Sequence, residues 1–467
     1  MPAETLHEIA EVVRGALTGG GAERRPSGYS IDSRTLRPGD LFFAIIGPKN
    51  DGHRFAEEAV AKGAVGVVVS YAPAAPAGAP AIVVSDTTQA LQDLAAERRR
   101  SLGAKVIGIT GSSGKTTTKE MTRHVLAGTF EVLASRGNLN NLYGLPLSLL
   151  GLEERHKVAI VEMGISTHGE LTRLAEIADP DVGVLTNVGG AHLAFFDGLD
   201  DYARAKAELF AAMRPNTTGV FNNDDERCRR IAASFRGYAV TFGMGAPADF
   251  AAEEYRGEGF SGSSFTLRHG GRRIPLRLRL AGAHHVLNAL AALAAGYMLG
   301  GDIEAMAARL PEFEPLAMRG RVVRLKGGAQ ILDDSYNANP AAVRAALAVL
   351  VQSDPGGGRR IAVLGDMLEL GRAEAALHRE IGRAVAASGI DLVLAVGPLS
   401  RETAAGAREA GFDRIRSMDT AEEAAAQAER EIRPGDLVLV KGSRGIGLDR
   451  VVTALQRAFG REDGGSR

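Results

Sequence analysis

The segment Thr110–Thr117, which reads Thr-Gly-Ser-Ser-Gly-Lys-Thr-Thr, limits the possible folds of this chain more than any other feature. An apolar, strand-like run (Val106–Thr110) precedes it, and a helical pattern (Thr116–Leu126) follows it. A glycine-rich turn between a strand and a helix is the context of a phosphate-binding P-loop. The glycines let backbone N–H groups turn toward phosphate oxygens, while Lys115 can reach the β- and γ-phosphates and the Thr116 hydroxyl can bind Mg²⁺. The motif therefore predicts an α/β nucleotide-binding domain.

Length, charge and cysteine content narrow the class further. The chain has 467 residues, which corresponds to about three domains at roughly 150 residues each. Its 55 basic and 56 acidic residues argue against nucleic-acid binding, which needs a local excess of Lys and Arg. Cys228 is the only cysteine, so an intrachain disulfide and a cysteine-based metal site are excluded. No apolar run approaches the roughly 20 residues of a membrane span, and Met1–Thr18 is typical of an amphipathic helix rather than a signal peptide. We therefore expect a cytoplasmic enzyme.

Strand-like and helical segments alternate and divide the chain into three α/β blocks. We expect a small α/β N-terminal domain over 1–101, a central P-loop ATPase domain with a parallel sheet over 102–318, and a C-terminal Rossmann-like domain over 319–467. Between about 237 and 280 the sequence is richer in Gly and Arg, which predicts a small antiparallel insert. The expected strands are 40–46, 65–70, 81–85, 106–110, 158–162, 182–186, 330–333, 361–364, 392–396 and 437–440. The expected helices include 284–298, 341–351, 373–387, 402–410 and 421–432.

Polar side chains stand where several predicted strands of the central block end. Ligands of parallel sheets bind at the carboxyl ends of strands. Glu162 ends the strand 158–162, where a carboxylate can bind Mg²⁺ directly or through water. Asn187 follows the strand 182–186, and His192 lies in the same loop. Lys206 falls in a helical pattern and, considered alone, would be a surface lysine.

Two polar turns follow strands of the third block. In Asp333–Pro340, Asn339 and Pro340 are a typical N-cap and first residue of a helix, but capping leaves the two aspartates unexplained. Lys441–Gly445 either adds cations to an anion site or is a solvated loop. Arg98–Arg100 are expected to form a solvated last helical turn that complements the helix dipole.

Together these motifs resemble those of the Mur ligases over essentially the whole chain. The short P-loop, in which Ile109 replaces the glycine of longer loops, is the form found in that family. The other matching segments in the first two blocks are Asp32–Arg34, Pro38–Ala44, Asp51–His53, Gly137–Asn141, Glu162–Gly164, Thr186–Asn187 and Ala191–Leu193. In the third block, Asp334–Pro340, Leu364–Gly371 with His378, and Lys441–Arg444 are similar to the branch of the family that adds D-alanyl-D-alanine.

The resemblance implies roles for individual residues. Lys206 corresponds to a lysine that is carbamylated in relatives, and the new carboxylate would help to bind a second Mg²⁺. The implied catalytic residues are Lys115, Glu162, His192 and Lys206, and the implied metal ligands are Thr116, Glu162, His192 and Lys206. The implied ATP-binding residues are Gly111, Ser112, Ser113, Gly114, Lys115, Thr116, Thr117, Asn288 at the adenine, and Arg319 and Asp334 from the C-terminal domain. The implied substrate-binding residues are Ser33, Arg34, Asn138, Asn141, Asn187, Tyr336, Asn337 and Asn339.

The reaction implied by the resemblance is amide-bond formation driven by ATP. The terminal carboxylate of UDP-MurNAc-tripeptide attacks the γ-phosphate, and the amine of D-Ala-D-Ala then attacks the resulting acyl phosphate. Two Mg²⁺ ions and Lys115 would offset the repulsion between carboxylate and triphosphate. Binding three small-molecule substrates on three domains implies a monomer that closes, with hinges near Ser101 and Met318–Arg319.

Other functions remain open at this stage. A sibling ligase that adds a diamino acid and folylpolyglutamate synthetase share the ATPase block, but the segments 334–340 and 364–371 argue against both. A regulatory P-loop ATPase acting through a protein partner leaves Asp51–His53 unexplained. An inactive binding relative is disfavoured because Lys115, Glu162, His192 and Lys206 are all present.

Overall fold

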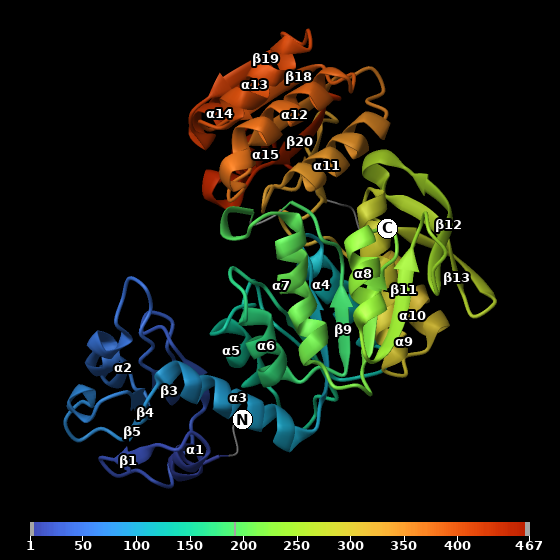
Figure 1. Ribbon diagram of the computed structural model, residues 1–467. Helices are drawn as coiled ribbons and strands as arrows, with labels where there is room; N and C mark the ends of the chain where they lie inside the picture. Colours follow the sequence, from blue (N-terminus) through green and yellow to red (C-terminus); the bar gives the residue numbers. More distant parts are fainter. Residues whose placement is uncertain (1–3, 191–192, 463–467) are drawn as a thin grey trace.

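The computed structural model describes residues 4–190 and 193–462 and contains three β-sheets that follow one another along the chain (Figure 1). Each sheet carries its own helices and forms one domain, from the blue N-terminal domain through the central domain to the orange and red C-terminal domain. The predicted α/β class and three-domain organisation are therefore confirmed. Within the described ranges, no helix combines the length and apolarity that crossing a membrane requires.

The N-terminal domain is built on a five-stranded sheet in the order β1-β5-β4-β3-β2, in which only β1 is antiparallel to its neighbour. Its elements are α1 (Leu6–Val12), β1 (Ala16–Thr18), β2 (Gly28–Ser30), β3 (Asp40–Phe43), α2 (Ala56–Ala61), β4 (Gly66–Val69), β5 (Ala81–Val83) and α3 (Thr87–Leu102). A capping box of Thr5 and Glu8 starts α1. The prediction of one helix up to Thr18 is wrong, because Arg14 adopts a left-handed φ of 55° that ends the helix and β1 follows.

The central domain contains a nine-stranded sheet in the order β14-β13-β12-β11-β10-β9-β6-β8-β7. Its strands are β6 (Lys105–Thr110), β7 (Val132–Ala134), β8 (Val158–Glu162), β9 (Val182–Leu185), β10 (Thr218–Asn222), β11 (Tyr238–Gly243), β12 (Phe250–Gly257), β13 (Ser263–His269) and β14 (Arg272–Leu278). Its helices are α4 (Lys115–Leu126), α5 (Gly144–Leu149), α6 (Glu170–Ala178), α7 (Leu199–Ala212), α8 (Glu226–Ser234), α9 (Ala283–Met298) and α10 (Ile303–Arg309). The expected small antiparallel insert is confirmed for β12, β13 and β14, which pair antiparallel. It is wrong for β11, which pairs parallel with both β10 and β12.

Alternating side chains of the central strands pack into two apolar layers, one on each face of the sheet. Ile107 and Ile109 of β6 pack with α4 and α9 on one face, whereas Val106 packs with α5 and α6 on the other. This alternation is the period of two that a strand imposes, and burial of both faces explains the near-continuous apolar runs. Because β6 lies between β9 and β8, the polar residues at the ends of these two strands flank the P-loop.

The C-terminal domain has a six-stranded sheet in the order β15-β16-β20-β17-β18-β19, with only β15 antiparallel. Its strands are β15 (Arg321–Arg324), β16 (Gln330–Asp333), β17 (Arg360–Gly365), β18 (Leu392–Val396), β19 (Ile415–Met418) and β20 (Leu437–Lys441). Its helices are α11 (Pro340–Gln352), α12 (Glu374–Ala386), α13 (Ser400–Glu409), α14 (Ala421–Glu431) and α15 (Asp449–Phe459). The predicted doubly wound pattern and the Asn339 N-cap of α11 are confirmed.

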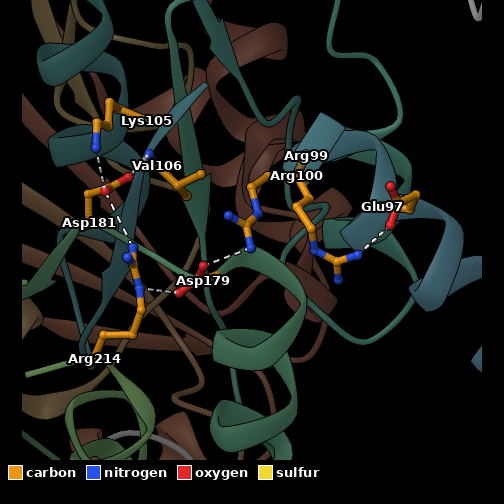
Figure 2. A network of polar contacts seen from close by, with 8 residues as sticks. All are labelled: Glu97, Arg99, Arg100, Lys105, Val106, Asp179, Asp181 and Arg214. Atoms are coloured by element: carbon orange, nitrogen blue, oxygen red, sulfur yellow. Dashed lines mark hydrogen bonds and ion pairs between the residues drawn. The ribbon is translucent and has the colours of Figure 1, made fainter. Parts of the chain in front are cut away.

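Helix α3 joins the first two domains and is anchored on both. Arg98 is 5% exposed and donates hydrogen bonds to the carbonyl of Leu152 and to Glu4. Arg99 pairs with Asp179 at 2.9 Å (Figure 2). The ion pair that the described residues give Arg100 is with Glu97 on its own helix. The prediction of a solvated arginine turn is therefore wrong for Arg98 and Arg99, whose partners come from distant segments of the chain, and fits Arg100 alone.

Candidate active site

The P-loop joins β6 to α4 and is glycine-rich because its surroundings leave no room for side chains. A Cβ atom at Gly111 would lie 1.9 Å from the Thr186 hydroxyl, and one at Gly114 would lie 2.3 Å from Oδ1 of Asn288. Gly111 and Gly114 also have φ values of +147° and +83°, which L-residues rarely adopt. The backbone of this loop is therefore pressed against the end of β9 and the start of α9.

Asn187 and Thr186, which follow β9, hold the P-loop in shape. The Asn187 side chain accepts a hydrogen bond from the Ser113 N–H at 3.0 Å and donates one to the Ser113 carbonyl at 3.1 Å. The Thr186 hydroxyl donates to the same carbonyl at 2.6 Å. Both polar atoms of the Asn187 amide therefore bind the P-loop backbone in this structure. The predicted contact between Asn187 and substrate stays a prediction.

Lys115 begins α4 and folds back over the loop. Its Nζ donates a hydrogen bond to the Gly111 carbonyl at 2.7 Å. Burial lowers the pKa of Lys115, the nearby Glu162 carboxylate opposes that shift, and Arg319 adds to it. The side chain therefore lies over the loop that is expected to bind phosphate, and the role of Lys115 in binding ATP stays a prediction.

Glu162 ends β8 and its carboxylate lies directly against α4. The side chain is 3% exposed. Thr116 Oγ1 donates to its Oε2 at 2.7 Å, and Asn140 Nδ2 donates to its Oε1 at 2.9 Å. A carboxylate next to the hydroxyl of a P-loop threonine is a donor set of hard oxygens, which is the chemistry that Mg²⁺ prefers. Thr116 and Glu162 therefore fit a magnesium ion.

Lys206 lies on α7 in a closed environment and is not the surface lysine that its helix alone would suggest. It is 1% exposed, its Nζ donates to Thr110 Oγ1 at 3.2 Å, and it lies 4.9 Å from the centre of the Tyr202 ring. Burial and the charge of Lys115 hold the pKa of Lys206 well below its usual value, against the opposing pull of nearby glutamates. This environment therefore favours the uncharged amine over the ammonium form.

His192, the remaining predicted metal ligand, lies outside the described residues. Across 4–190 and 193–462, no group of three or more His, Cys, Asp or Glu side chains comes together as a metal site. The second ion predicted for Glu162, His192 and carbamylated Lys206 therefore stays a prediction.

The C-terminal domain brings polar groups to the same edge of the central sheet. Asn339 Nδ2 donates to Ser113 Oγ in the P-loop at 2.9 Å, while Asn339 Oδ1 caps α11. Asp334 pairs with the buried Lys441 at 2.5 Å. The Arg319 guanidinium stacks on the Tyr336 ring, 3.9 Å from its centre. Tyr336 and Asn339 also line a pocket, together with Asn337, Ala338, Leu368, Glu369, Ser443, Arg444 and Gly445.

The structure brings together some of the other predicted residues and not others. Asn288 supports the base of the P-loop, where it accepts a hydrogen bond from Thr118 at 3.3 Å. Asn141 caps α5 through the N–H groups of residues 143 and 144, and the Asn138 side chain is exposed in the same loop. Ser33 and Arg34 belong to the N-terminal domain, where Arg34 pairs with Asp32 at 2.7 Å.

Asn140 and Thr110 contact proposed catalytic groups but were not singled out from the sequence. Asn140 stands among two other asparagines in 138–141, and no sequence signal separates the one that binds Glu162. Thr110 is the first residue of the P-loop segment, so the sequence could have indicated that its hydroxyl lies close to the phosphate site.

Comparison with protein families matches three models along the chain. Residues 26–99 match the Mur ligase family catalytic domain, residues 109–296 match the Mur ligase middle domain, and residues 318–444 match the Mur ligase glutamate ligase domain. These ranges fall on the three sheets of the structure.

Relatives of known name match nearly the full length. The UDP-N-acetylmuramoyl-tripeptide–D-alanyl-D-alanine ligases of Bacillus subtilis and Escherichia coli are each 34% identical and cover 97% of this chain and 98% of their own. A crystal structure of MurF from Acinetobacter baumannii superposes with a TM-score of 0.87 at 31% identity and covers 98% of this chain and 99% of its own. MurF ligase from Thermotoga maritima, solved in complex with ADP, gives a TM-score of 0.81 at 29% identity over 92% and 97% of the two chains.

Proposed function

The chain belongs to the Mur ligase family, and we propose that it is the ligase that joins D-alanyl-D-alanine to UDP-N-acetylmuramoyl-tripeptide at the expense of ATP. The observation that carries the proposal is the meeting of a P-loop, a buried carboxylate and a second domain. Glu162 faces Thr116 at the loop, and Asn339 of the C-terminal domain reaches Ser113 in the same loop. A site assembled from two domains suits a reaction in which a nucleotide on one domain must meet an amine on the other.

The chemistry follows from the weakness of a carboxylate as an electrophile. The terminal carboxylate of the tripeptide attacks the γ-phosphorus of ATP, the bond to the β-phosphate oxygen breaks, and ADP leaves an acyl phosphate. The amine of D-Ala-D-Ala then attacks the acyl carbon, loses a proton and expels phosphate, which completes the amide. No protein nucleophile takes part, so the protein acts by positioning and by offsetting the repulsion between two anions.

Lys115 and the P-loop amides would hold the triphosphate during the first step. Arg319, whose charge is felt at Lys115, would approach the phosphates from the C-terminal side. Thr116 and Glu162 would hold Mg²⁺, which supplies positive charge against the transferring phosphoryl group. Asn288 and Asp334 would complete the nucleotide site at the base and at the C-terminal domain.

Lys206 is proposed to be carbamylated. An uncharged lysine can attack carbon dioxide, form a carbamate and release one proton, and its lowered pKa favours that uncharged form. The carbamate would then bind a second Mg²⁺ with Glu162 and His192. Its single described hydrogen-bond partner, the Thr110 hydroxyl, leaves the amine free to react.

The remaining substrate contacts are proposed on either side of the ATP site. Ser33 and Arg34 would bind the UDP moiety, and Asn138, Asn141 and Asn187 the peptide. Tyr336, Asn337 and Asn339 would bind D-Ala-D-Ala in the pocket that they line. We further propose a cytoplasmic monomer, with domains over 1–101, 102–318 and 319–467.

Phosphate release tests the proposal. The purified chain is given Mg²⁺-ATP and UDP-MurNAc-tripeptide, with lysine or diaminopimelate at the third position, with and without D-Ala-D-Ala. We expect release that needs both substrates, together with a UDP-MurNAc-pentapeptide product detected by mass. Turnover with UDP-MurNAc-dipeptide and a free diamino acid, in place of the tripeptide and D-Ala-D-Ala, would favour the sibling ligase. ATP turnover that depends on neither substrate would favour a regulatory ATPase.

A further inference from the structure

Lys119 is a completely buried lysine that the proposed reaction does not use. It lies on α4, one turn beyond Lys115, with 0% of its surface exposed. Its Nζ donates a hydrogen bond to the Ser135 carbonyl and lies 3.1 Å from Oε1 of Glu120. Burying an ammonium group is costly unless it is paired and hydrogen-bonded, so the position of Lys119 calls for a local reason.

Ser135 connects this lysine to the proposed metal-binding strand. It directly follows β7 and is 2% exposed. Its N–H donates to the Ile160 carbonyl at 3.0 Å, and its hydroxyl accepts a hydrogen bond from the Glu162 N–H at 3.3 Å. Ser135 therefore fixes the end of β7 to the end of β8, at the residue that carries the carboxylate.

Asn140 closes the same loop on the other side of Glu162. Its side chain donates to Oε1 of Glu162 at 2.9 Å, and its carbonyl accepts from the Gly164 N–H at 2.8 Å. A Cβ atom at Gly164 would come within 3.1 Å of the Asn140 amide, so glycine permits the close approach. The segment 135–140 is therefore hydrogen-bonded to the end of β8 at two places. Ser135 binds it at residues 160 and 162, and Asn140 binds it at residues 162 and 164.

Among the described residues, each oxygen of the Glu162 carboxylate accepts one side-chain hydrogen bond. Oε2 receives the Thr116 hydroxyl, and Oε1 receives the Asn140 amide. A cation held by the oxygen atoms of Thr116 and Glu162 would replace the hydrogen bond from the Thr116 hydroxyl to Glu162. The Asn140 side chain would then be the group that holds the orientation of the Glu162 carboxylate.

We propose that Lys119, Ser135 and Asn140 are positioning residues that fix the Glu162 carboxylate in the orientation that binds the divalent cation of the nucleotide. This inference rests on the proposed function. Lys119 anchors the start of the loop, Ser135 joins it to the Glu162 backbone, and Asn140 holds the carboxylate itself. Partners of this kind orient metal ligands in other proteins, and their loss typically weakens metal binding about 10- to 100-fold.

The test measures how the affinity for ADP depends on Mg²⁺ concentration, by calorimetric titration without turnover. In Asn140→Ala and Lys119→Met we expect the half-saturating Mg²⁺ concentration to rise by about tenfold. The rate at saturating Mg²⁺ should fall much less, because the lost contact acts through metal affinity. Thr122→Val is the matched control. Thr122 is also buried on α4, but the one described partner of its hydroxyl is the Thr118 carbonyl, so the Mg²⁺ dependence of this variant should be unchanged.

Wild-type Mg²⁺ dependence in a folded Asn140→Ala would overturn the inference. If Lys119→Met does not fold, Asn140→Ala decides alone, because Asn140 lies in a partly exposed loop outside the core. A change of equal size in Thr122→Val would also overturn it, since general loosening of α4 would then explain the effect. If the unmodified chain binds ADP without any response to Mg²⁺, the proposed function fails at its metal site, and that outcome is seen before any variant is compared.

Discussion

The N-terminal and central domains share one large apolar core, whereas the central and C-terminal domains meet through a smaller apolar contact and a few polar contacts. Residues of α1, β3 and α3 pack in the same cluster as α5 and α6, and Arg98 and Arg99 add buried polar anchors. At the junction between the central and C-terminal domains, the described central residues Phe260 and Ala281 join the C-terminal core cluster. Asn339 donates a hydrogen bond to Ser113, and the Ala194 N–H donates one to the Glu369 carbonyl. Large shared cores resist relative motion, and small polar interfaces permit it.

The two segments that connect the domains also differ in how firmly they are held. Ser101 lies in the last turn of α3, which is held on both sides, so a hinge at that position is disfavoured. Met318 has a left-handed φ of +62° and is followed by Gly320 at +77°, where the chain enters the C-terminal domain. We therefore expect the first two domains to move as one body and the C-terminal domain to close onto the P-loop.

The largest effect should come from a change that leaves both junctions intact. Lys115→Met removes the cation above the P-loop without touching α3 or Asn339. We expect about a 10³-fold loss of turnover, because a preorganised charge at the transferring phosphoryl group is lost. Steady-state phosphate release measures it, and calorimetry should show unchanged unfolding transitions. Near-normal turnover would contradict the assignment of the ATP site.

The next change breaks the polar bridge of the second junction. Asn339→Ser keeps a side chain that can cap α11 but is too short to reach Ser113. We expect kcat/KM for D-Ala-D-Ala to fall by roughly 10- to 100-fold, since small misplacements of reacting groups have effects of this size. Asn339→Ala should lose the same activity and, in addition, about 1 kcal/mol of helix stability. Equal activity in wild type and Asn339→Ser would show that closure does not depend on this bridge.

Lowering the pH should weaken the docking of the C-terminal domain before it weakens the contact between the N-terminal and central domains. His284 lies on α9, near Asp334 and Lys441, and burial lowers its pKa to about 4. Because the docked state disfavours the proton, its contribution to docking is complete above the ordinary pKa of about 6.5 and is lost as pH falls from there toward 4. The slope is at most about 1.4 kcal/mol per pH unit. Scattering profiles at pH 7.5 and pH 5 measure the docking. His284→Asn should reduce the pH dependence without abolishing it, because burial also lowers the pKa of the neighbouring His285.

A milder change probes the first junction. Asp179→Asn keeps a residue that tolerates the left-handed φ of +43° but removes the charge between Arg99 and Arg214 (Figure 2). We expect about 1 kcal/mol of destabilisation, seen as a lower midpoint for the joint unfolding of the first two domains. Arg230→Gln, which removes an exposed pair with Glu226, is the control and should leave that midpoint unchanged. Separate transitions for the two domains would contradict a shared core.

The smallest effect is expected at Met318. Met318→Gly removes the steric penalty of a left-handed residue but makes the unfolded chain more flexible. The two terms nearly cancel, so we expect a change of less than about 1 kcal/mol in unfolding free energy. Turnover should stay within a few-fold of wild type, as measured by phosphate release. A large loss would mean that the strained linker itself holds the closed geometry.

The sequence predicted the parallel strands that end at the site, because β6, β8 and β9 are buried on both faces and read as unbroken apolar runs. It did not predict β15, whose ends are arginines. Local rules also failed for Arg98, since its partners Leu152 and Glu4 are distant in sequence. Within the site, P-loop residues follow from motif and context, whereas the contact of Asn140 with Glu162 depends on how a loop folds in three dimensions.

Distances between spin labels test most directly whether the first two domains keep a fixed arrangement while the C-terminal domain moves. Labels at the exposed positions Lys49, Arg236 and Arg430 report one domain each, with the buried Cys228 changed to serine. On addition of an ATP analogue and UDP-MurNAc-tripeptide, we expect the 49–236 distance to stay constant and the 236–430 distance to change. A shift in the first distance with none in the second would contradict the account.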